Sequence, residues 1–285
     1  MRLATIRTSD GAAAGTAAVR LDEEVATDTG AADVGELLAD PDWRARAAAA
    51  SGRTWPVDGL DYAPLVPRPE KIVCVGLNYR NHILEMGHEL PEHPTLFPKY
   101  APTLIGAYDD IVLPDPEVST KVDWEVELAF VIGSSIRHAA DDEAALAAVA
   151  GYTVLNDVSV RDWQSHTSQF LAGKSFEGTT PVGPALVTSD DPAAAGPWAL
   201  QCAVNGTVMQ KSETGQLVFD VATLVRYLST IFTLHPGDLV ATGTPGGVGH
   251  ARKPPVYLSA GDVVTSTIDG IGELRNTCRP EHRGA

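Results

Sequence analysis

From residue 71 onward, the chain is a succession of short apolar runs separated by residues that favour turns. Asn205-Gly206 and Asp269-Gly270 each lie between two such runs, and these dipeptides favour the tight turns of β-hairpins. The pattern predicts a mainly β fold of the α+β class. Ten runs have the length of strands: 72–76, 124–132, 152–156, 184–188, 200–204, 207–210, 239–242, 255–258, 263–268 and 271–276.

Helical periodicity is confined to a few segments. Apolar residues recur at helical spacing through 219–232, and Asp220 is placed to cap the start of that helix. The alanine-rich stretches DWRARAAAAS and DDEAALAAVAG predict two further helices, the second on the surface.

A proline-rich connector divides the chain. PLVPRPEK at 64–71 has three prolines, which favour an extended linker, and a strand-like run follows at once. The sequence therefore predicts a small N-terminal α/β domain at 1–66 and a second, larger domain at 67–285.

The composition argues against several classes of partner. The formal net charge is −16, whereas nucleic acids and anionic membranes need a basic surface. No apolar run approaches the roughly 18 residues of a membrane-spanning helix, and MRLATIRTSD has no signal-peptide core. Cys74, Cys202 and Cys278 are far apart, which favours reduced thiols over a disulfide framework. We therefore expect a cytoplasmic protein.

The segment DWEVELAF at 123–130 combines a strand pattern with paired acids. Side chains two positions apart in a strand point to the same face, so Glu125 and Glu127 share one face and Trp124 and Val126 the other. Two interpretations are open. The segment can be an edge strand with a solvated acidic face, or its two carboxylates can converge on a cation.

Asp157 can supply a third carboxylate. It follows the apolar run of GYTVLNDVSVRDWQ (151–164), where it can be a turn residue or an oxygen ligand. Three carboxylates with waters suit Mg²⁺, Mn²⁺ or Ca²⁺ rather than a thiophilic metal. Arg161, four residues later, can be a salt-bridge partner or a clamp for a substrate carboxylate.

His82 and Glu85 form a candidate acid–base pair in VGLNYRNHILEMG (75–87). They lie three residues apart and share a face on a helical turn. A carboxylate beside an imidazole raises its basicity, as removal of a proton from water requires. An exposed His–Glu pair on a short helix has the same pattern, so both interpretations stay open.

Five blocks in this order resemble the fumarylacetoacetate hydrolase family: VGLNYRNHILEMG, PTLFPKYAPTLIG, DWEVELAFVIG, GYTVLNDVSVRDWQ and GKSFEGTTPVGP. The resemblance covers roughly 70–280, and the chain is similar to short bacterial members such as acylpyruvate hydrolases and oxaloacetate decarboxylases. It implies mixed β-strands rolled around a metal site and assembly as a homodimer.

The resemblance also implies roles for individual residues. Glu125, Glu127 and Asp157 become metal ligands, and His82 and Glu85 become the pair that activates water. Lys174 would stabilise negative charge on the substrate. Larger members carry an additional acidic ligand where this chain has Asn78. One carboxylate fewer favours Mg²⁺ or Mn²⁺ over Ca²⁺. Substrate contacts are implied for Tyr79, Lys99, Arg161, Gln164 and Thr244.

The activity implied is divalent-metal-dependent hydrolysis of the C–C bond of a β-dicarbonyl acid in aromatic catabolism. An acylpyruvate or fumarylpyruvate would give pyruvate and a carboxylic acid. The same site suits decarboxylation of oxaloacetate, or hydration or isomerisation of an unsaturated oxo acid. A catalytically idle binding protein is a further alternative. Residues 88–96 are expected to form a lid over the small oxo-acid substrate.

Overall fold

The computed structural model describes residues 1–10, 13–85, 87 and 89–282. Its largest sheet is mixed. It contains β1 (Arg2–Asp10), β2 (Ala13–Leu21), β3 (Val25–Asp28), β4 (Thr54–Pro56), β5 (Ile72–Gly76), β6 (Thr95–Lys99), β7 (Leu104–Ile105), β10 (Val126–Ile132), β11 (Val149–Asn156), β13 (Thr180–Thr188) and β16 (Leu239–Ala241). The strand order is β4-β3-β2-β1-β13-β11-β10-β16-β5-β6, and β7 pairs with β13.

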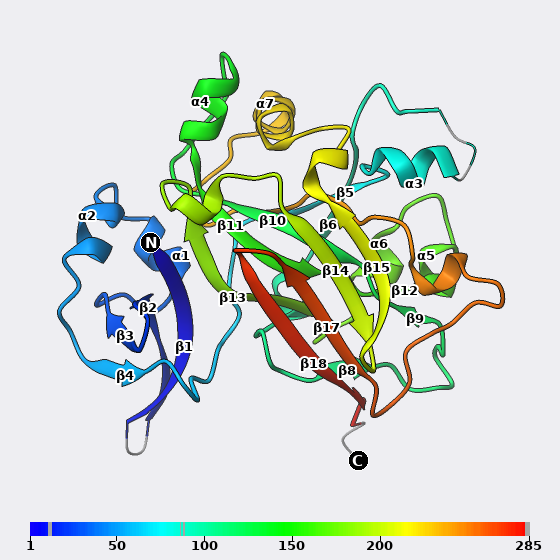
Figure 1. The fold of residues 1–285 in the computed structure, drawn as a ribbon, viewed down its shortest axis with the longest axis horizontal. Coiled ribbons are helices and arrows are strands. Elements are labelled where there is room, and N and C mark those ends of the chain that lie inside the picture. The colour runs from blue at the N-terminus through cyan, green and yellow to red at the C-terminus, as the bar shows by residue number, and fades with distance from the viewer. Residues whose placement is uncertain (11–12, 86, 88, 283–285) are drawn as a thin grey trace.

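A second sheet lies against the first (Figure 1). It is made of β8 (Ile111–Leu113), β14 (Ala199–Val204), β15 (Thr207–Glu213), β17 (Val263–Ile268) and β18 (Gly272–Pro280), in the order β15-β14-β17-β18-β8. Strands β14 and β17 contact β10, and β17 and β18 contact β11. A short pair is formed by β9 (Val122–Asp123) and β12 (Ser159–Val160).

The helices are short and lie around the sheets (Figure 1). The α-helices are α1 (Val34–Leu38), α2 (Trp43–Ala48), α3 (Arg80–Glu85), α4 (Asp142–Ala147), α5 (Arg161–Gln164), α6 (Leu171–Lys174) and α7 (Val221–Ile231). Single 3₁₀ turns are η1 (Ala101–Thr103), η2 (Pro192–Ala194), η3 (Thr214–Gln216) and η4 (Gly249–Ala251). No helix in the described part of the chain is long and apolar enough to span a membrane.

Strand β10 is a central strand with cores on both faces. It pairs antiparallel with β11 on one side and with β16 on the other. Leu128 and Phe130 pack into one apolar cluster, and Ala129 and Val131 into another. Because side chains alternate along a strand, the glutamates at 125 and 127 face the side of Ala129. The interpretation as an edge strand with a solvated acidic face is therefore wrong.

Several local predictions are confirmed. The runs at 72–76 and 263–268 coincide with β5 and β17. At the turn between β14 and β15, Asn205 and Gly206 both have positive φ, 50° and 78°, as the predicted hairpin requires. The carboxylate of Asp220 accepts a hydrogen bond of 2.8 Å from the backbone N–H of Thr223 and caps α7.

The prediction of a strand at 255–258 is wrong. Pro254 and Pro255 have no backbone N–H to donate to a ladder. Val256 and Leu258 instead donate single hydrogen bonds, of 3.1 and 2.8 Å, to the carbonyls of Gly249 and Val122. This extended segment thereby fastens the turn η4 to the end of β9.

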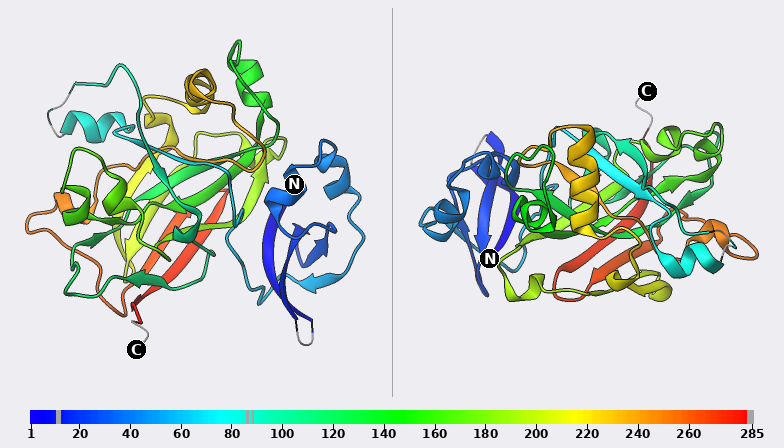
Figure 2. Two further views of the ribbon diagram at one scale, coloured as in Figure 1. Left: turned by 180° about the vertical axis from the view of Figure 1, so that it is seen from behind. Right: turned by 90° about the horizontal axis from the view of Figure 1, so that it is seen from above.

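The N-terminal residues form strands that the sequence did not predict individually. Strands β1 to β4 extend the large sheet, with α1 and α2 beside them, and the group stands at one side of the molecule in two views (Figure 2). Strand β1 joins the rest through β13, with Arg2 opposite Val187 and Leu3 opposite Leu186. The proposed domain boundary between 66 and 67 stays a prediction.

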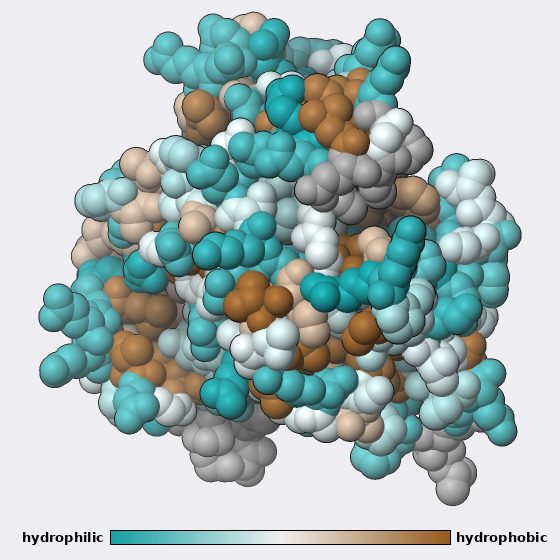
Figure 3. Space-filling view, turned by 45° about the vertical axis from the view of Figure 1, so that its right-hand side comes forward, coloured by the Kyte–Doolittle hydropathy of each residue, from teal (hydrophilic) through white to brown (hydrophobic). Residues whose placement is uncertain are grey.

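The surface is mostly hydrophilic on the face that carries α3 and β15. Hydrophobic residues gather there only in small separate groups (Figure 3). Scattered groups of this kind are ordinary for a globular protein.

Candidate metal centre

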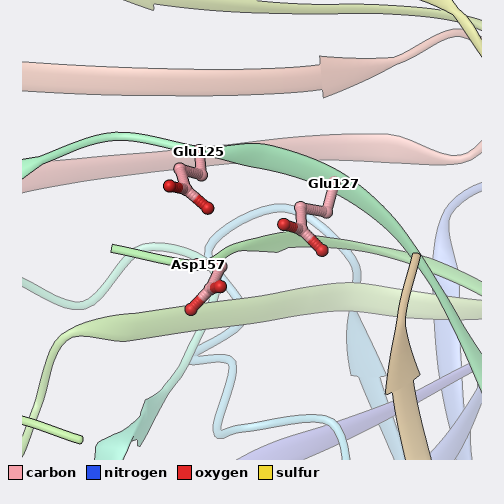
Figure 4. Close-up of side chains that lie close together, drawn as sticks. All are labelled: Glu125, Glu127 and Asp157. Carbon is pink, nitrogen blue, oxygen red and sulfur yellow. The ribbon is translucent and has the colours of Figure 1, made fainter. Parts of the chain in front are cut away.

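Three carboxylates meet at the end of the β10–β11 pair. Glu125 precedes β10, Glu127 lies in it, and Asp157 follows β11. The antiparallel register places Val126 opposite Asn156, and the N–H of Asp157 donates to the carbonyl of Glu125 at 2.9 Å. Each side chain offers an oxygen, and the three oxygens lie within 4.8 Å of one another (Figure 4). The strand alternation predicted for DWEVELAF thus places Glu125 and Glu127 on one face, where Asp157 joins them.

Two lysines and an arginine surround these acids. The ammonium of Lys174 lies 2.7 Å from an oxygen of both Glu125 and Asp157. Lys99 donates to the other oxygen of Asp157 at 2.7 Å, and Arg161 pairs with the other oxygen of Glu125 at 2.7 Å. The five side chains that form these ion pairs are almost fully buried, so their charges interact at low dielectric.

The carboxylates differ in how well they are paired. Burial raises the pKa of Glu127 well above its ordinary value, and the charges of Asp157 and Glu125 add to this rise. Burial acts in the same direction on Asp157, but Lys174 and Lys99 outweigh it and hold its pKa below the ordinary value. Glu127 receives a hydrogen bond from the N–H of Gly243, at 2.8 Å, and no ion pair within the described residues. It is thus the acid that most needs a further positive charge.

The donor set fits a hard divalent cation. With Asp123, four buried carboxylates face three cationic side chains, which leaves one negative charge. Each carboxylate oxygen has two lone pairs, so an oxygen of Glu125 or Asp157 that is in an ion pair keeps one lone pair free. Glu125, Glu127 and Asp157 can therefore hold Mg²⁺ or Mn²⁺, which would make the cluster net positive.

The carboxylate cluster opens into a cavity of about 240 Å³. One end is charged, with Glu125, Glu127 and Lys174, and the wall beside it is apolar, with Phe97 and Phe170. The two phenyl rings meet edge to face with centroids 5.6 Å apart. A small acid can enter such a space with its charged end toward the cluster.

The predicted substrate contacts divide into two groups. Arg161, Gln164 and Thr244 line the cavity. Lys99 and Tyr79 are buried and do not appear among its described lining residues. The ammonium of Lys99 donates a hydrogen bond to the carboxylate of Asp157. Burial, and then the charge of Glu127, raises the pKa of Tyr79.

The hydroxyl of Thr244 is already engaged. It donates to the carbonyl of Val126 at 3.0 Å and accepts from the amide of Gln210 at 2.8 Å. Gln210 in turn accepts from the N–H of Val126 at 3.0 Å. These bonds fix the backbone between the two glutamates, and they give Thr244 a structural part beside its predicted contact with substrate.

The predicted acid–base pair lies on α3. The backbone of His82 and Glu85 is helical there, as the three-residue spacing predicted. Their side chains lie outside the described residues, as does residue 88 at the start of the expected lid. The roles of the pair and of the lid stay predictions.

Asp123 is a central residue that the sequence analysis missed. It is fully buried, and its two oxygens accept from Arg161 Nε at 2.8 Å and from the N–H groups of Gly249 and His250 at 2.7 and 2.9 Å. Gly249 is required at this contact because an added Cβ would lie 2.0 Å from the carbonyl of Val256. The sequence did hold a signal, because Asp123 lies two positions before Glu125 and strand alternation places it on the same face as the acidic pair.

Comparisons with known proteins identify relatives of this chain. The family described as "Fumarylacetoacetate (FAA) hydrolase C-terminal" matches residues 71–279. The chain belongs to this family. An oxaloacetate tautomerase from Rattus norvegicus is 45% identical over 81% of the chain and 73% of its own length. One from Bos taurus is 48% identical over 74% of the chain and 67% of its own length.

Solved structures of the family share the whole fold. Fumarylacetoacetate hydrolase from Exiguobacterium antarcticum has a TM-score of 0.83 at 33% identity, covering 98% of this chain and 100% of that one. A 5-carboxymethyl-2-hydroxymuconate delta-isomerase from Mycobacterium smegmatis has a TM-score of 0.80 at 32% identity, covering 99% and 100%. The mainly β family fold with a small N-terminal α/β part is therefore confirmed, and the chain belongs to a superfamily of enzymes.

Asp157 has two ammonium partners, whereas Glu127 has no ion pair among the described residues. Neutralising each acid should therefore have opposite effects on the stability of the fold. A raised carboxyl pKa in the fold means that stability is greatest below the ordinary pKa and falls as pH rises through the raised value. In EDTA at pH 8, Glu127→Gln should therefore raise the melting temperature, and the gain should shrink toward pH 5. Calorimetric melting across pH measures both effects.

Asp157→Asn is the matched control. The pKa of Asp157 is lowered, so its contribution to stability is present above the ordinary pKa and is lost at acid pH. Its loss leaves the buried ammonium of Lys99 without a carboxylate and that of Lys174 with Glu125 alone, and should cost about 3–5 kcal/mol at pH 8. Equal destabilisation by both variants would contradict the assigned pairing.

Proposed function

We propose that this chain is a divalent-metal-dependent enzyme that interconverts the keto and enol forms of oxaloacetate or a closely similar 2-oxo dicarboxylic acid. The observation that carries the proposal is the 45–48% identity to mammalian proteins named oxaloacetate tautomerases, over 74–81% of the chain. The structural likeness to a named isomerase supports the same type of reaction.

The reaction moves one proton between C3 and the oxygen on C2. The anion formed between the two tautomers is an enolate, so a catalyst must stabilise negative charge on that oxygen and exchange a proton at C3. Glu125, Glu127 and Asp157 would hold the metal ion, which would supply Lewis-acid polarisation of the 2-oxo oxygen.

Lys174 provides a fixed positive charge beside the reacting end. Burial lowers the pKa of a lysine, but the charges of Asp157 and Glu125 outweigh this and raise the pKa of Lys174. The ammonium therefore keeps its proton, and it lines the cavity. It suits stabilisation of an enolate oxygen and does not suit removal of a proton.

Arg161 provides a donor for a substrate carboxylate. Its Nε and Nη1 are paired with Asp123, Glu125 and Gln164, whereas Nη2 is buried without a partner within the described residues. A buried N–H without an acceptor costs free energy, which a bound carboxylate would recover as a charge-assisted hydrogen bond.

Exchange of the proton at C3 is assigned to His82 and Glu85. Their helix α3 begins three residues after Leu77, which lines the cavity. The pair would move a proton to and from carbon in the tautomerase, and to and from water in a hydrolase.

Hydrolysis of an acylpyruvate is the second candidate. It is supported by the family's description and by the structural likeness to a fumarylacetoacetate hydrolase. Decarboxylation of oxaloacetate would release CO₂ and leave the enolate of pyruvate, whose negative charge lies on the same C2 oxygen. A homodimer stays a prediction. So does a cytoplasmic location, since the mammalian relatives are named as mitochondrial.

The tautomerase should be detectable by ultraviolet absorbance. The purified protein should speed the conversion of enol-oxaloacetate to the keto form, EDTA should abolish the effect, and Mg²⁺ or Mn²⁺ should restore it. Conversion at the buffer rate, with pyruvate released from acylpyruvates, would reject the tautomerase in favour of the hydrolase. Full activity in EDTA would reject a metal role for the carboxylate cluster.

Lys174 and Lys99 offer a matched pair of substitutions. Each makes a 2.7 Å ion pair with Asp157, but Lys174 alone of the two lines the cavity. Lys174→Met should lower kcat by about 10²–10³-fold, the cost of losing one preorganised charge at an oxyanion. Lys99→Met should lower the melting temperature similarly with a much smaller loss in kcat. Equal losses of kcat would show that Lys174 acts only through the buried cluster.

A further inference from the structure

His250 is a titratable side chain on the cavity wall that has no part in the carboxylate cluster. It belongs to the turn η4, and Val248, Ala251 and Phe170 are among the other residues that line the cavity. The cavity lining thus combines the charged groups of the cluster with apolar side chains and an imidazole.

The position of His250 is fixed at two points. Its backbone N–H donates to the buried carboxylate of Asp123 at 2.9 Å, and its ring Nδ1 lies 2.9 Å from the hydroxyl of Tyr257. An exposed side chain normally samples several rotamers, and a hydrogen bond that holds one rotamer lowers the conformational entropy of the side chain before any ligand binds. A preorganised imidazole at a cavity wall suits ligand recognition.

The bond to Tyr257 leaves a donor available. Burial, and then the charge of Asp123, raises the pKa of Tyr257, so its hydroxyl keeps its proton and can donate it to Nδ1. The neutral ring then carries its own proton on Nε2. Within the described part of the chain, Nε2 of His250 has no hydrogen-bond partner.

A dicarboxylic acid needs such a donor. Its 2-oxo acid end would occupy the charged end of the cavity, beside Lys174 and Arg161. Its second carboxylate would then lie along the wall, where burial without a donor is unfavourable. The Nε2–H of His250 offers a hydrogen-bond donor to that carboxylate.

We infer that His250, oriented by Tyr257, binds the distal carboxylate of a dicarboxylic 2-oxo acid and gives the enzyme its preference over monocarboxylic acids. This inference rests on the proposed function for the orientation of the substrate.

Binding of two stable acids tests it without turnover. L-Malate and L-lactate share the carboxylate and a 2-hydroxy group in place of the oxo group, and only malate has a distal carboxylate. Calorimetric titration of the Mg²⁺-loaded protein should show malate binding about 10-fold or more tightly than lactate. A hydrogen bond to a charged group accounts for a preference of this size.

His250→Phe keeps an aromatic ring and removes its nitrogens. It should weaken malate about 10-fold and leave lactate within about twofold, and Tyr257→Phe should weaken malate less. His235→Phe is the control, because that ring contacts Ser135 and does not line the cavity among the described residues. No preference for malate in the wild type, an unchanged preference in His250→Phe, or equal loss of both acids would each overturn the inference. A confirmed preference without tautomerase activity would reject the proposed reaction alone.

Discussion

The ion pairs between buried acids and buried bases determine how the rest of the site is built. Glu125 and Asp157 are each held by two cationic groups at 2.7 Å. Burying charges is costly unless each is paired with good geometry, so the surrounding backbone must hold these groups closely. The register of β10 and β11, the position of Lys174 at the end of α6 and that of Lys99 at the end of β6 all serve that requirement.

The same ion pairs leave Glu127 exceptional. Burial, and then the charges of Asp157 and Glu125, raise its pKa, and the N–H of Gly243 is its hydrogen-bond donor. A divalent cation would relieve that cost, since it adds positive charge where the cluster has an excess of acid. An anionic substrate would then meet a net positive site, with Lys174 beside its reacting end. The relatives named oxaloacetate tautomerases fit this picture, because an enolate is the anion that such a site stabilises.

Much of the fold could be predicted from local patterns. Alternation placed the two glutamates on one face, Asn205-Gly206 marked a hairpin, and Asp220 marked the start of α7. Strands β1 to β4 escaped prediction because alanine and threonine give a weak apolar signal. Pro254-Pro255 misled because apolar neighbours resemble a strand although prolines cannot join a ladder.

The site was predictable only as far as residue type and order carry it. The carboxylates at 125, 127 and 157 were found together, and the structure brings them within 4.8 Å. Asp123 and His250 were missed because their importance comes from contacts across more than a hundred residues of sequence. Lys99 faces Asp157 rather than the cavity, a placement that no sequence spacing indicates.

Crystals grown with Mn²⁺ and measured at its absorption edge test the central claim most directly. One anomalous peak is expected between Glu125, Glu127 and Asp157, with an oxygen of each within about 2.5 Å, the range for hard divalent ions. Ordered crystals with no peak at the three carboxylates, or a peak only elsewhere in the molecule, would contradict the account.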